Sequence, residues 1–249
     1  MTYTPFYTFG ADRKSRWLIT CDHATNTVPP FVNGGDLGLP HEDMERHIAY
    51  DPGAFEVAKH LGQLLEAPVV ATNFSRLVID PNRGEDDPTL LMKLSDGSII
   101  PGNRHADAAE RENRLELCYR PYDRELARLA ALGEDTGKTI LVSLHSFTRQ
   151  FRGRPPRPWD IGILYPPSER FSPALIQCLR DQGDLCVGEN EPYTGRLPGD
   201  AIDRHATAFG RPNTLIELRN DLIADHEQQV GWAERLAPIL IAARERSGL

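Results

Sequence analysis

The segment TILVSLHS, residues 139–146, is a short apolar run that leads to a histidine. Apolar runs of about four to eight residues are typical of strands that are buried on both faces. The segment predicts a strand over Ile140–Leu144, and five further runs of this kind occur along the chain: Trp17–Asp22, Val69–Thr72, Leu77–Asp80, Ile161–Tyr165 and Thr214–Leu218. Because these runs alternate with amphipathic segments, the sequence predicts an α/β fold with helices on both faces of the sheet.

Three segments repeat apolar residues at helical spacing. They are Phe55, Ala58, Leu61 and Leu65; Leu115, Tyr119, Tyr122, Leu126 and Leu129; and Trp232, Leu236, Ile239 and Ala243, the last within a helix expected from about Asp225 to Arg246. No Gly/Ser-rich linker, charge block or internal repeat divides the chain. We therefore expect one domain over residues 1–249.

The composition is that of a globular protein. The 249 residues are 40% hydrophobic and 26% charged, which excludes wholesale disorder. Asp and Glu number 36 against 28 Lys and Arg, so a broad nucleic-acid-binding surface is not expected. No apolar run approaches the roughly 20 residues that cross a bilayer, and the first residues lack the order of a signal peptide. We expect a cytoplasmic protein with no membrane partner.

The four cysteines are Cys21, Cys118, Cys178 and Cys186. They are scattered and form no CxxC pair, so neither a disulfide framework nor a thiolate zinc site is expected. Each is expected to be a small buried side chain.

Two stretches, Gly84–Asn103 and Arg149–Trp159, are expected to be long loops. The second reads RQFRGRPPRPW and carries four arginines: Arg149, Arg152, Arg154 and Arg157. These arginines either attract an anionic substrate or belong to a solvated basic loop.

Histidines follow or end two of the predicted strands. His23, in CDHATN, comes directly after the strand that begins at Trp17, and His145 ends the run from Ile140. Ligands of open parallel sheets bind at the carboxyl ends of the strands. Two imidazoles there predict a metal site such as that of zinc, whose catalytic sites use three protein ligands. The alternative for each residue is a histidine that is hydrogen-bonded at a strand end and has no ligand role.

The segment SRLVIDPNR, residues 75–83, places polar groups directly after an apolar run. Asp80, Asn82 and Arg83 bring a carboxylate, an amide and a guanidinium to one rim of the sheet. Arginine binds carboxylates in a bidentate manner, so this combination suits an acidic substrate. The alternative is a strand-end turn with a surface pair of Asp80 and Arg83.

Glu217 is a charged residue inside the apolar run of TLIELRND. A buried carboxylate is costly unless it has a partner or faces a polar site. Glu217 is therefore a candidate general base, and a structural ion pair with Arg219 is the alternative.

Two more motifs carry polar candidates. In HIAYDPGA, His47 and Asp51 lie just ahead of a predicted helix, so Asp51 is either a helix cap or a third metal ligand. In GDAIDRHATAFG, Arg204 and His205 form a polar pair, for which a solvated helical face is the default interpretation.

The ordered series DHATN, HIAYDPGA, SRLVIDPNR, YRPYDREL, LVSLHSFT, RPWDIGILY, ENEPYTGR and LIELRNDLI resembles the N-formylglutamate amidohydrolase family over nearly the whole chain. That family is similar to zinc hydrolases of the carboxypeptidase and aspartoacylase type. The resemblance therefore implies a single-domain α/β fold with a mixed, largely parallel central sheet and a site at the strand ends.

The resemblance also implies roles for individual residues, residue by residue. His23 and His145 would bind Zn²⁺, and Glu217 would act as base and then as acid, with Arg76 as a second catalytic residue. Asp80, Asn82 and Arg83 match the D-x-N-R element and would bind substrate, the Asn82 amide and the Arg83 guanidinium holding its carboxylate. Arg204 and His205 match a family Arg-His pair and would also bind substrate. Asn26 stands where relatives of the aspartoacylase type have a glutamate ligand, so Asp51 is the candidate third ligand. Asp123 stands where the family often has histidine, and Ser143 and Leu144 replace a more polar run.

The leading hypothesis is metal-assisted hydrolysis of the amide of a small acidic N-acyl amino acid, with N-formyl-L-glutamate giving formate and L-glutamate. One alternative is a hydrolase of another carboxylate-bearing amide or peptide. Another is a metal-free binding protein for acidic metabolites, which the residue Asn26 motivates. The sequence does not determine the oligomeric state.

Overall fold

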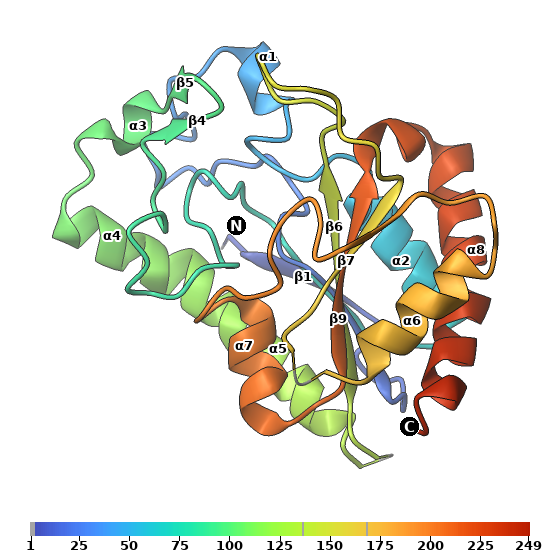
Figure 1. The fold of residues 1–249 in the computed structure, drawn as a ribbon. Coiled ribbons are helices and arrows are strands. Elements are labelled where there is room, and N and C mark those ends of the chain that lie inside the picture. The colour runs from blue at the N-terminus through green and yellow to red at the C-terminus, as the bar shows by residue number, and fades with distance from the viewer. Residues whose placement is uncertain (1–2, 136, 168) are drawn as a thin grey trace.

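A seven-stranded mixed sheet forms the centre of the fold (Figure 1). The computed structural model describes residues 3–135, 137–167 and 169–249. Across the sheet the strands are β1 (Phe6–Phe9), β3 (Val69–Thr72), β2 (Trp17–Cys21), β6 (Ile140–Phe147), β9 (Asn213–Arg219), β7 (Ile161–Leu164) and β8 (Val187–Glu189). The four strands β3, β2, β6 and β9 are mutually parallel, β1 and β7 pair antiparallel with their inner neighbours, and β8 is parallel to β7.

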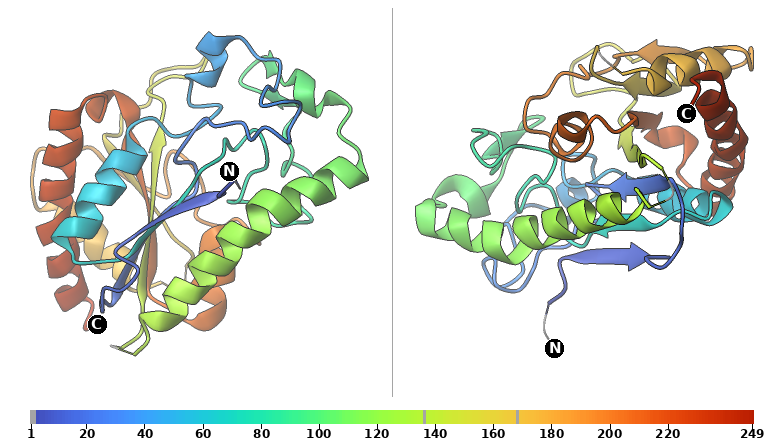
Figure 2. Two further views of the ribbon diagram at one scale, coloured as in Figure 1. Left: turned by 180° about the vertical axis from the view of Figure 1, so that it is seen from behind. Right: turned by 90° about the horizontal axis from the view of Figure 1, so that it is seen from below.

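Helices cover both faces of the sheet, as Figures 1 and 2 show. On one face lie α2 (Ala54–Leu64), α6 (Phe171–Arg180) and α8 (His226–Arg246), and on the other lie α5 (Arg120–Leu132) and α7 (Ala201–His205). The helix α4 (Ala108–Arg114) and the π-helical turn η1 (Leu115–Tyr119) lead into α5. The predicted α/β fold with a mixed, largely parallel sheet is confirmed.

Successive side chains of a strand point to opposite faces of the sheet, and this explains why the protein has two separate hydrophobic cores. In β2, Trp17, Ile19 and Cys21 belong to the core on the side of α2 and α8, whereas Leu18 faces the side of α5. Every residue of β2, β3 and β6 is buried. Such strands read as continuous apolar runs rather than as alternating ones, which is why the sequence located them.

Short elements lie in the connections. They are α1 (His41–Met44), β4 (Leu94–Ser95), β5 (Ser98–Ile99), α3 (Pro101–Arg104), η2 (Thr207–Phe209) and η3 (Asn220–Leu222). The stretch expected to be a loop from Gly84 to Asn103 contains the hairpin of β4 and β5. Its two turn residues, Asp96 and Gly97, have φ angles of 40° and 81°, the positive values that a tight hairpin turn requires.

The predicted strand Leu77–Asp80 was wrong. Its apolar residues are buried, but its backbone groups bond to separate loops: the amide of Val78 donates to Ser75 and that of Asp80 donates to Leu90. The run is apolar because it packs into the core beneath α5, and none of the strands among the described residues pairs with it. The segment is a sequence of turns that leads into the site.

The expected C-terminal helix is α8, whose N-cap Asp225 accepts a hydrogen bond from the amide of Gln228 at 2.9 Å. All four cysteines are free, and Cys186 is exposed rather than buried as expected. Across the described parts of the chain, no helix combines the length and the apolar character that a membrane span requires.

Candidate active site

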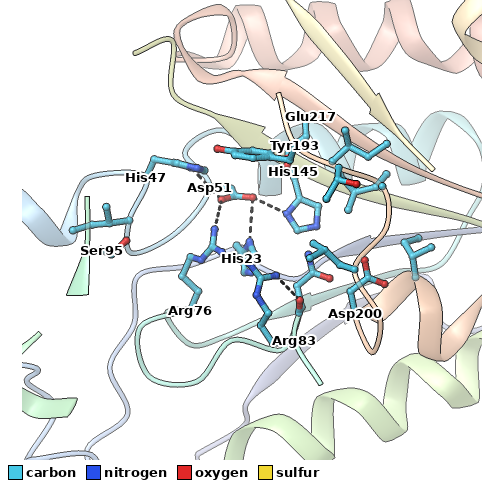
Figure 3. Close-up of a pocket in the computed structure, with 18 of the residues that line it drawn as sticks. His23, His47, Asp51, Arg76, Arg83, Ser95, His145, Tyr193, Asp200 and Glu217 are labelled. Carbon is cyan, nitrogen blue, oxygen red and sulfur yellow. Dashed lines mark hydrogen bonds and ion pairs between the residues drawn. The ribbon is translucent and has the colours of Figure 1, made fainter. Parts of the chain in front are cut away.

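A cavity of about 350 Å³ opens at the carboxyl ends of β2, β6 and β9 (Figure 3). Its polar lining comprises His23, His47, Asp51, Arg76, Asn82, Arg83, Ser95, His145, Tyr165, Tyr193, Thr194, Asp200 and Glu217, and its apolar lining includes Ile48, Met92, Phe151, Leu164, Leu197, Ile202 and Leu215. His23 lies two residues beyond β2, and in the register of the sheet His145 of β6 pairs with Glu217 of β9. Three adjacent strands therefore bring imidazoles and a carboxylate to one place.

Three buried side chains meet at the base of this cavity. The Oδ2 atom of Asp51 lies 2.8 Å from Nδ1 of His145 and 3.4 Å from Nδ1 of His23. The two imidazole rings are 4.9 Å apart, and one potential ligand atom from each of the three residues lies within 4.8 Å of the others. His23, Asp51 and His145 therefore form a possible three-residue metal site.

The backbone places Asp51 against the strand ends. Its amide donates to the carbonyl of His23 at 2.8 Å, which ties the segment before α2 to the end of β2. The next residues turn sharply at Gly53, whose φ is 80° and whose missing Cβ would lie 2.2 Å from the carbonyl oxygen of Ile223. Gly53, not Asp51, is the N-cap of α2, so the helix-cap alternative for Asp51 is not what the structure shows.

Two further carboxylates engage the outer nitrogens of the imidazoles. Asp80 Oδ1 lies 2.7 Å from Nε2 of His23, while Nε2 of His145 lies 3.0 Å from the Ser143 hydroxyl and 3.4 Å from Asp22 Oδ2. The hydroxyl of Tyr122 donates to the other oxygen of Asp22. These contacts leave both Nδ1 atoms facing Asp51, and carboxylates in this outer position typically orient metal-binding histidines.

The charges in this cluster shift the pKa values of its members strongly. Burial alone would raise the pKa of Asp51, but the imidazoles of His23 and His145 outweigh it and hold that pKa well below its usual range. Burial would likewise lower the pKa of His145, yet Asp22 and Asp51 raise it well above the ordinary value. Paired acidic and basic groups of this kind are common at functional sites.

Glu217 behaves differently from these carboxylates. Burial is the largest influence and raises its pKa to about 8, with Asp51 adding to the rise and His145 opposing it. Arg219, the alternative partner expected for Glu217, pairs instead with Asp160 and Asp221. The Glu217 carboxyl is therefore available to a molecule in the cavity.

Several buried polar atoms of the lining have no hydrogen-bond partner within the described chain. They are Nε of Arg76, Oε2 of Glu217, and Nδ1 of His47 with Oδ1 of Asp51, which face each other as an ion pair at 3.3 Å. Leaving such atoms unpaired costs free energy, so a concentration of them in one cavity indicates a bound group. Two imidazole nitrogens and a carboxylate oxygen are ligands that zinc takes, so the residues fit a zinc ion.

Two guanidinium groups line the same cavity. Arg76 is already neutralised, since its Nη2 lies 2.9 Å from Asp80 Oδ2 and its Nη1 lies 3.7 Å from Asp51 Oδ1. Arg83 donates to the carbonyl of Asn82 at 2.7 Å and has no carboxylate within 4.0 Å among the residues that the structure describes. The surface pair of Asp80 and Arg83 considered above is not formed, and Arg83 is left to bind an anion.

Seven of the predicted site residues line the cavity together: His23, Asp51, Arg76, Asn82, Arg83, His145 and Glu217. Asp80 lies behind His23 with both oxygens engaged, so it contacts the histidine rather than the cavity. Arg204 and His205 also lie outside the lining and both pair with Asp123.

Arg204 supports the cavity wall from outside the cavity. It donates to the main-chain carbonyls of Pro81 and Arg83 at 2.9 and 3.0 Å, and so supports the segment that presents Asn82 and Arg83. His205 is 4% exposed, which excludes the solvated face expected for this pair.

Sequence reasoning missed other residues of the site. Asp22 and Tyr122 orient His145 from behind, and Tyr193 and Asp200 line the cavity. Burial raises the pKa of Asp200 to about 6. A signal for Asp22 was present, since it directly precedes His23 after a strand. Tyr193 lies in the segment ENEPYTGR quoted above, but no role was assigned to it.

Comparisons with known proteins identify a family for this chain. A family model described as N-formylglutamate amidohydrolase matches residues 15–224. An N-formylglutamate deformylase of Pseudomonas putida is 30% identical over 244 residues, which cover 88% of this chain and 86% of that protein. The N-formylglutamate deformylase of Pseudomonas aeruginosa is 30% identical over 219 residues, which cover 80% of this chain and 76% of that protein.

Two solved structures resemble the fold. The crystal structure of a gene product of Agrobacterium tumefaciens is 33% identical with a TM-score of 0.91, covering 100% of this chain and 98% of that one. The crystal structure of an N-formylglutamate amidohydrolase from Ralstonia eutropha is 21% identical with a TM-score of 0.69, covering 98% of this chain and 99% of that one. At that identity the second likeness speaks for the fold alone.

Proposed function

The chain belongs to the N-formylglutamate amidohydrolase family, and we propose that it hydrolyses N-formyl-L-glutamate to formate and L-glutamate with the help of a zinc ion. The family makes it a hydrolase of a linear amide. One observation carries the finer proposal: a single cavity joins the cluster of His23, Asp51 and His145 to a buried carboxylate, Glu217, and to the guanidinium of Arg83, which has no carboxylate partner among the described residues.

We assign the metal ligands to His23, Asp51 and His145. When bound, the zinc ion supplies Lewis-acid activation of water and of the amide carbonyl. Asp80 and Asp22 engage the outer imidazole nitrogens, which keeps Nδ1 of each histidine directed at the site. Asn26, which motivated the metal-free alternative, donates to Met44 and Glu45 outside the cavity, so Asp51 takes the place of the missing acidic ligand.

Glu217 carries the proton through the reaction. Its Oε2 accepts a proton from the attacking water while the water oxygen bonds to the formyl carbon, and the electrons of the carbonyl double bond move to its oxygen. The same carboxyl then gives the proton to the amide nitrogen as the carbon–nitrogen bond breaks, releasing formate and the free amine. Its unpartnered Oε2 in the cavity wall suits this task.

Two arginines bind different negative charges of the reacting substrate. Arg76 lies beside the cluster with an unpaired Nε–H, so it stabilises the oxygen that becomes negative when water adds. Arg83 binds the substrate carboxylate together with the amide of Asn82, whose Oδ1 accepts a hydrogen bond from the Ala201 amide at 3.2 Å and so fixes the side chain. Holding the carboxylate orients the formyl group toward Glu217.

A second candidate function is hydrolysis of another carboxylate-bearing amide. The apolar part of the lining favours it, because Ile48, Met92, Leu164 and Leu215 offer a surface suited to an uncharged side chain or a larger acyl group.

A substrate series tests both candidates. Release of the free amine from N-formyl-L-glutamate is compared with its release from N-formyl-L-leucine, N-acetyl-L-glutamate and a short formylated peptide, using the zinc-loaded protein and its Glu217→Gln variant. We expect the highest kcat/KM for N-formyl-L-glutamate and a loss of at least about 100-fold in the variant. A preference for N-formyl-L-leucine would favour the second candidate, and no hydrolysis of any compound would reject both.

A further inference from the structure

The arginine-rich loop expected between Arg149 and Trp159 directs one of its arginines at the cavity wall. The side chains of Arg149 and Arg152 are 63% and 64% exposed. Arg157, by contrast, donates from Nη1 to the hydroxyl of Tyr193 at 3.0 Å and to the carbonyl of Thr148 at 3.2 Å. Because Tyr193 lines the cavity, Arg157 reaches the site through this tyrosine.

Aromatic faces hold the Arg157 guanidinium in place. Its central carbon lies 4.1 Å from the ring centroid of Phe151, 5.0 Å from that of Tyr193 and 5.7 Å from that of Phe147. No carboxylate lies within 4.0 Å of it in the described part of the chain. Cation–π contacts fix the group without neutralising its charge, so its hydrogen bond to Tyr193 is charge-assisted.

The segment that carries Tyr193 is itself closely packed on β7. The Oδ1 atom of Asn190 accepts hydrogen bonds from the amides of Tyr165 and Gly195 at 3.0 and 3.1 Å. A Cβ on Gly162 would lie 2.1 Å from the carbonyl oxygen of Glu191, and one on Gly195 would lie 2.2 Å from the Tyr165 amide nitrogen. These close approaches pack the backbone of the Tyr193 segment directly against β7.

The Tyr193 hydroxyl is free to donate a hydrogen bond. Burial raises its pKa to about 12 and Glu217 adds to the rise, so the phenol stays protonated at neutral pH. A hydroxyl has one donor and two acceptor positions, and the N–H of Arg157 uses an acceptor position. No acceptor among the described residues takes the phenolic hydrogen. Figure 3 shows the Tyr193 ring over Asp51, on the side of the cavity that holds His47, His145 and Glu217.

We propose that Tyr193 is a further catalytic residue, whose hydroxyl donates a hydrogen bond to the carbonyl oxygen of the scissile amide, and that Arg157 is the positioning residue that holds this hydroxyl in place. The inference rests on the proposed function. As the water oxygen bonds to the carbonyl carbon, the carbonyl electrons move to the oxygen that Tyr193 faces, and its hydrogen bond strengthens. Tyr193 keeps its proton throughout, so the proton transfers remain with Glu217.

The experiment measures kcat and KM for the zinc-loaded protein and four variants. Removing one donor to a developing oxyanion costs about 10²- to 10³-fold in kcat, so Tyr193→Phe should lose that much while KM changes less than about threefold. Arg157→Ala should lower kcat by a smaller factor, and Arg157→Lys should restore part of the loss. Arg154→Ala is the matched control, because Arg154 lies exposed on the same loop.

A double variant separates positioning from a merely structural role. If Arg157 acts through Tyr193, Arg157→Ala should change kcat by less than about twofold in the Tyr193→Phe background. A wild-type kcat in Tyr193→Phe would overturn this inference but not the proposed function. The same holds if Arg157→Ala lowers kcat equally with and without the tyrosine hydroxyl. A wild-type protein that hydrolyses none of the amides would overturn it together with the proposed function. Melting curves of each variant identify any that fail to fold.

Discussion

Asp51 and His145 lie 94 positions apart in the chain, yet Oδ2 of Asp51 is 2.8 Å from Nδ1 of His145 in the interior of the protein. Asp51 precedes α2 and His145 belongs to β6, so the contact joins a loop to the middle of the sheet. Asp22 lies on the far side of His145, with Oδ2 3.4 Å from Nε2 of the ring. The imidazole thus lies between two carboxylates, one facing the cavity and one behind it.

The carboxylates behind the histidines are expected to control metal affinity. Asp80→Asn keeps the shape of the side chain but removes the charge that faces Nε2 of His23. Changes to such outer partners typically weaken metal binding by about 10- to 100-fold. Zinc affinity measured by competition with a chromogenic chelator should fall by that factor. Tyr122→Phe, which removes the hydroxyl that donates to Asp22, should weaken binding less. Unchanged affinity in Asp80→Asn would mean that Asp80 does not orient the ligand.

Much of the fold follows from residue patterns, because buried parallel strands are continuous apolar runs. The runs at Trp17, Val69, Ile140, Ile161 and Thr214 each overlap a strand of the structure. The run Leu77–Asp80 is equally apolar, but it is buried by packing alone. Local sequence does not distinguish these cases, because a strand needs a neighbour that only the tertiary structure supplies.

The site was predictable where a polar residue follows an apolar strand, as His23 does, or interrupts one, as His145 and Glu217 do. Residues that act through another side chain were not predictable in this way. Asp80 and Arg204 were expected to contact substrate, but each is turned away from the cavity by partners distant in sequence. The direction of a side chain within a polar motif depends on such partners.

The pH dependence of turnover should follow Glu217. A general base must be ionised, and burial raises the pKa of Glu217 to about 8 in the metal-free protein, so its active form accumulates as pH rises through that value. A bound divalent cation favours the ionised form and lowers this pKa. In the zinc-loaded protein kcat/KM should therefore rise with pH along an acidic limb whose midpoint lies below about 8. Measurements from pH 5 to 9 check this, and the opposite slope in that limb would exclude Glu217 as the base.

Arg83 should govern substrate binding more than chemistry. Arg83→Ala removes a charged donor to the substrate carboxylate, which is worth about 1.5–3 kcal/mol, so KM should rise roughly 10- to 100-fold with a smaller change in kcat. Its main chain is held separately by Tyr119 and Arg204, so the variant should fold normally. Steady-state kinetics with N-formyl-L-glutamate test this, with Arg196→Ala, an exposed side chain that is not part of the cavity lining, as the control. A drop in kcat at constant KM would assign Arg83 to the reaction itself.

Asp200 should make the folded protein less stable as pH rises. Burial raises the pKa of Asp200 to about 6, above the value of the unfolded chain, so its ionisation opposes folding from about pH 4 upward and does so fully above about pH 6. Asp200→Asn keeps an acceptor for the Asp203 amide but removes the charge. Urea unfolding of the metal-free protein should show the variant more stable at pH 7.5, by up to about 3 kcal/mol, and no such gain at pH 4.

Asp107→Asn is the matched control for this change, since Asp107 is the exposed N-cap of α4 and accepts from the amide of Glu110 at 2.9 Å. Its effect on stability should be the same at both pH values. A gain in Asp200→Asn that is as large at pH 4 as at pH 7.5 would show that charge is not the cause.

The most direct measurement is a titration of the metal-stripped protein with zinc while formate release from N-formyl-L-glutamate is followed. We predict that activity rises in proportion to zinc and reaches its plateau at about one ion per chain. His23→Ala, Asp51→Asn and His145→Ala should neither bind zinc at this stoichiometry nor regain activity, while His60→Ala, which alters a histidine outside the cavity, should behave as wild type. Full activity in the stripped protein, or stoichiometric zinc retained by all three variants, would contradict the assignment of the site.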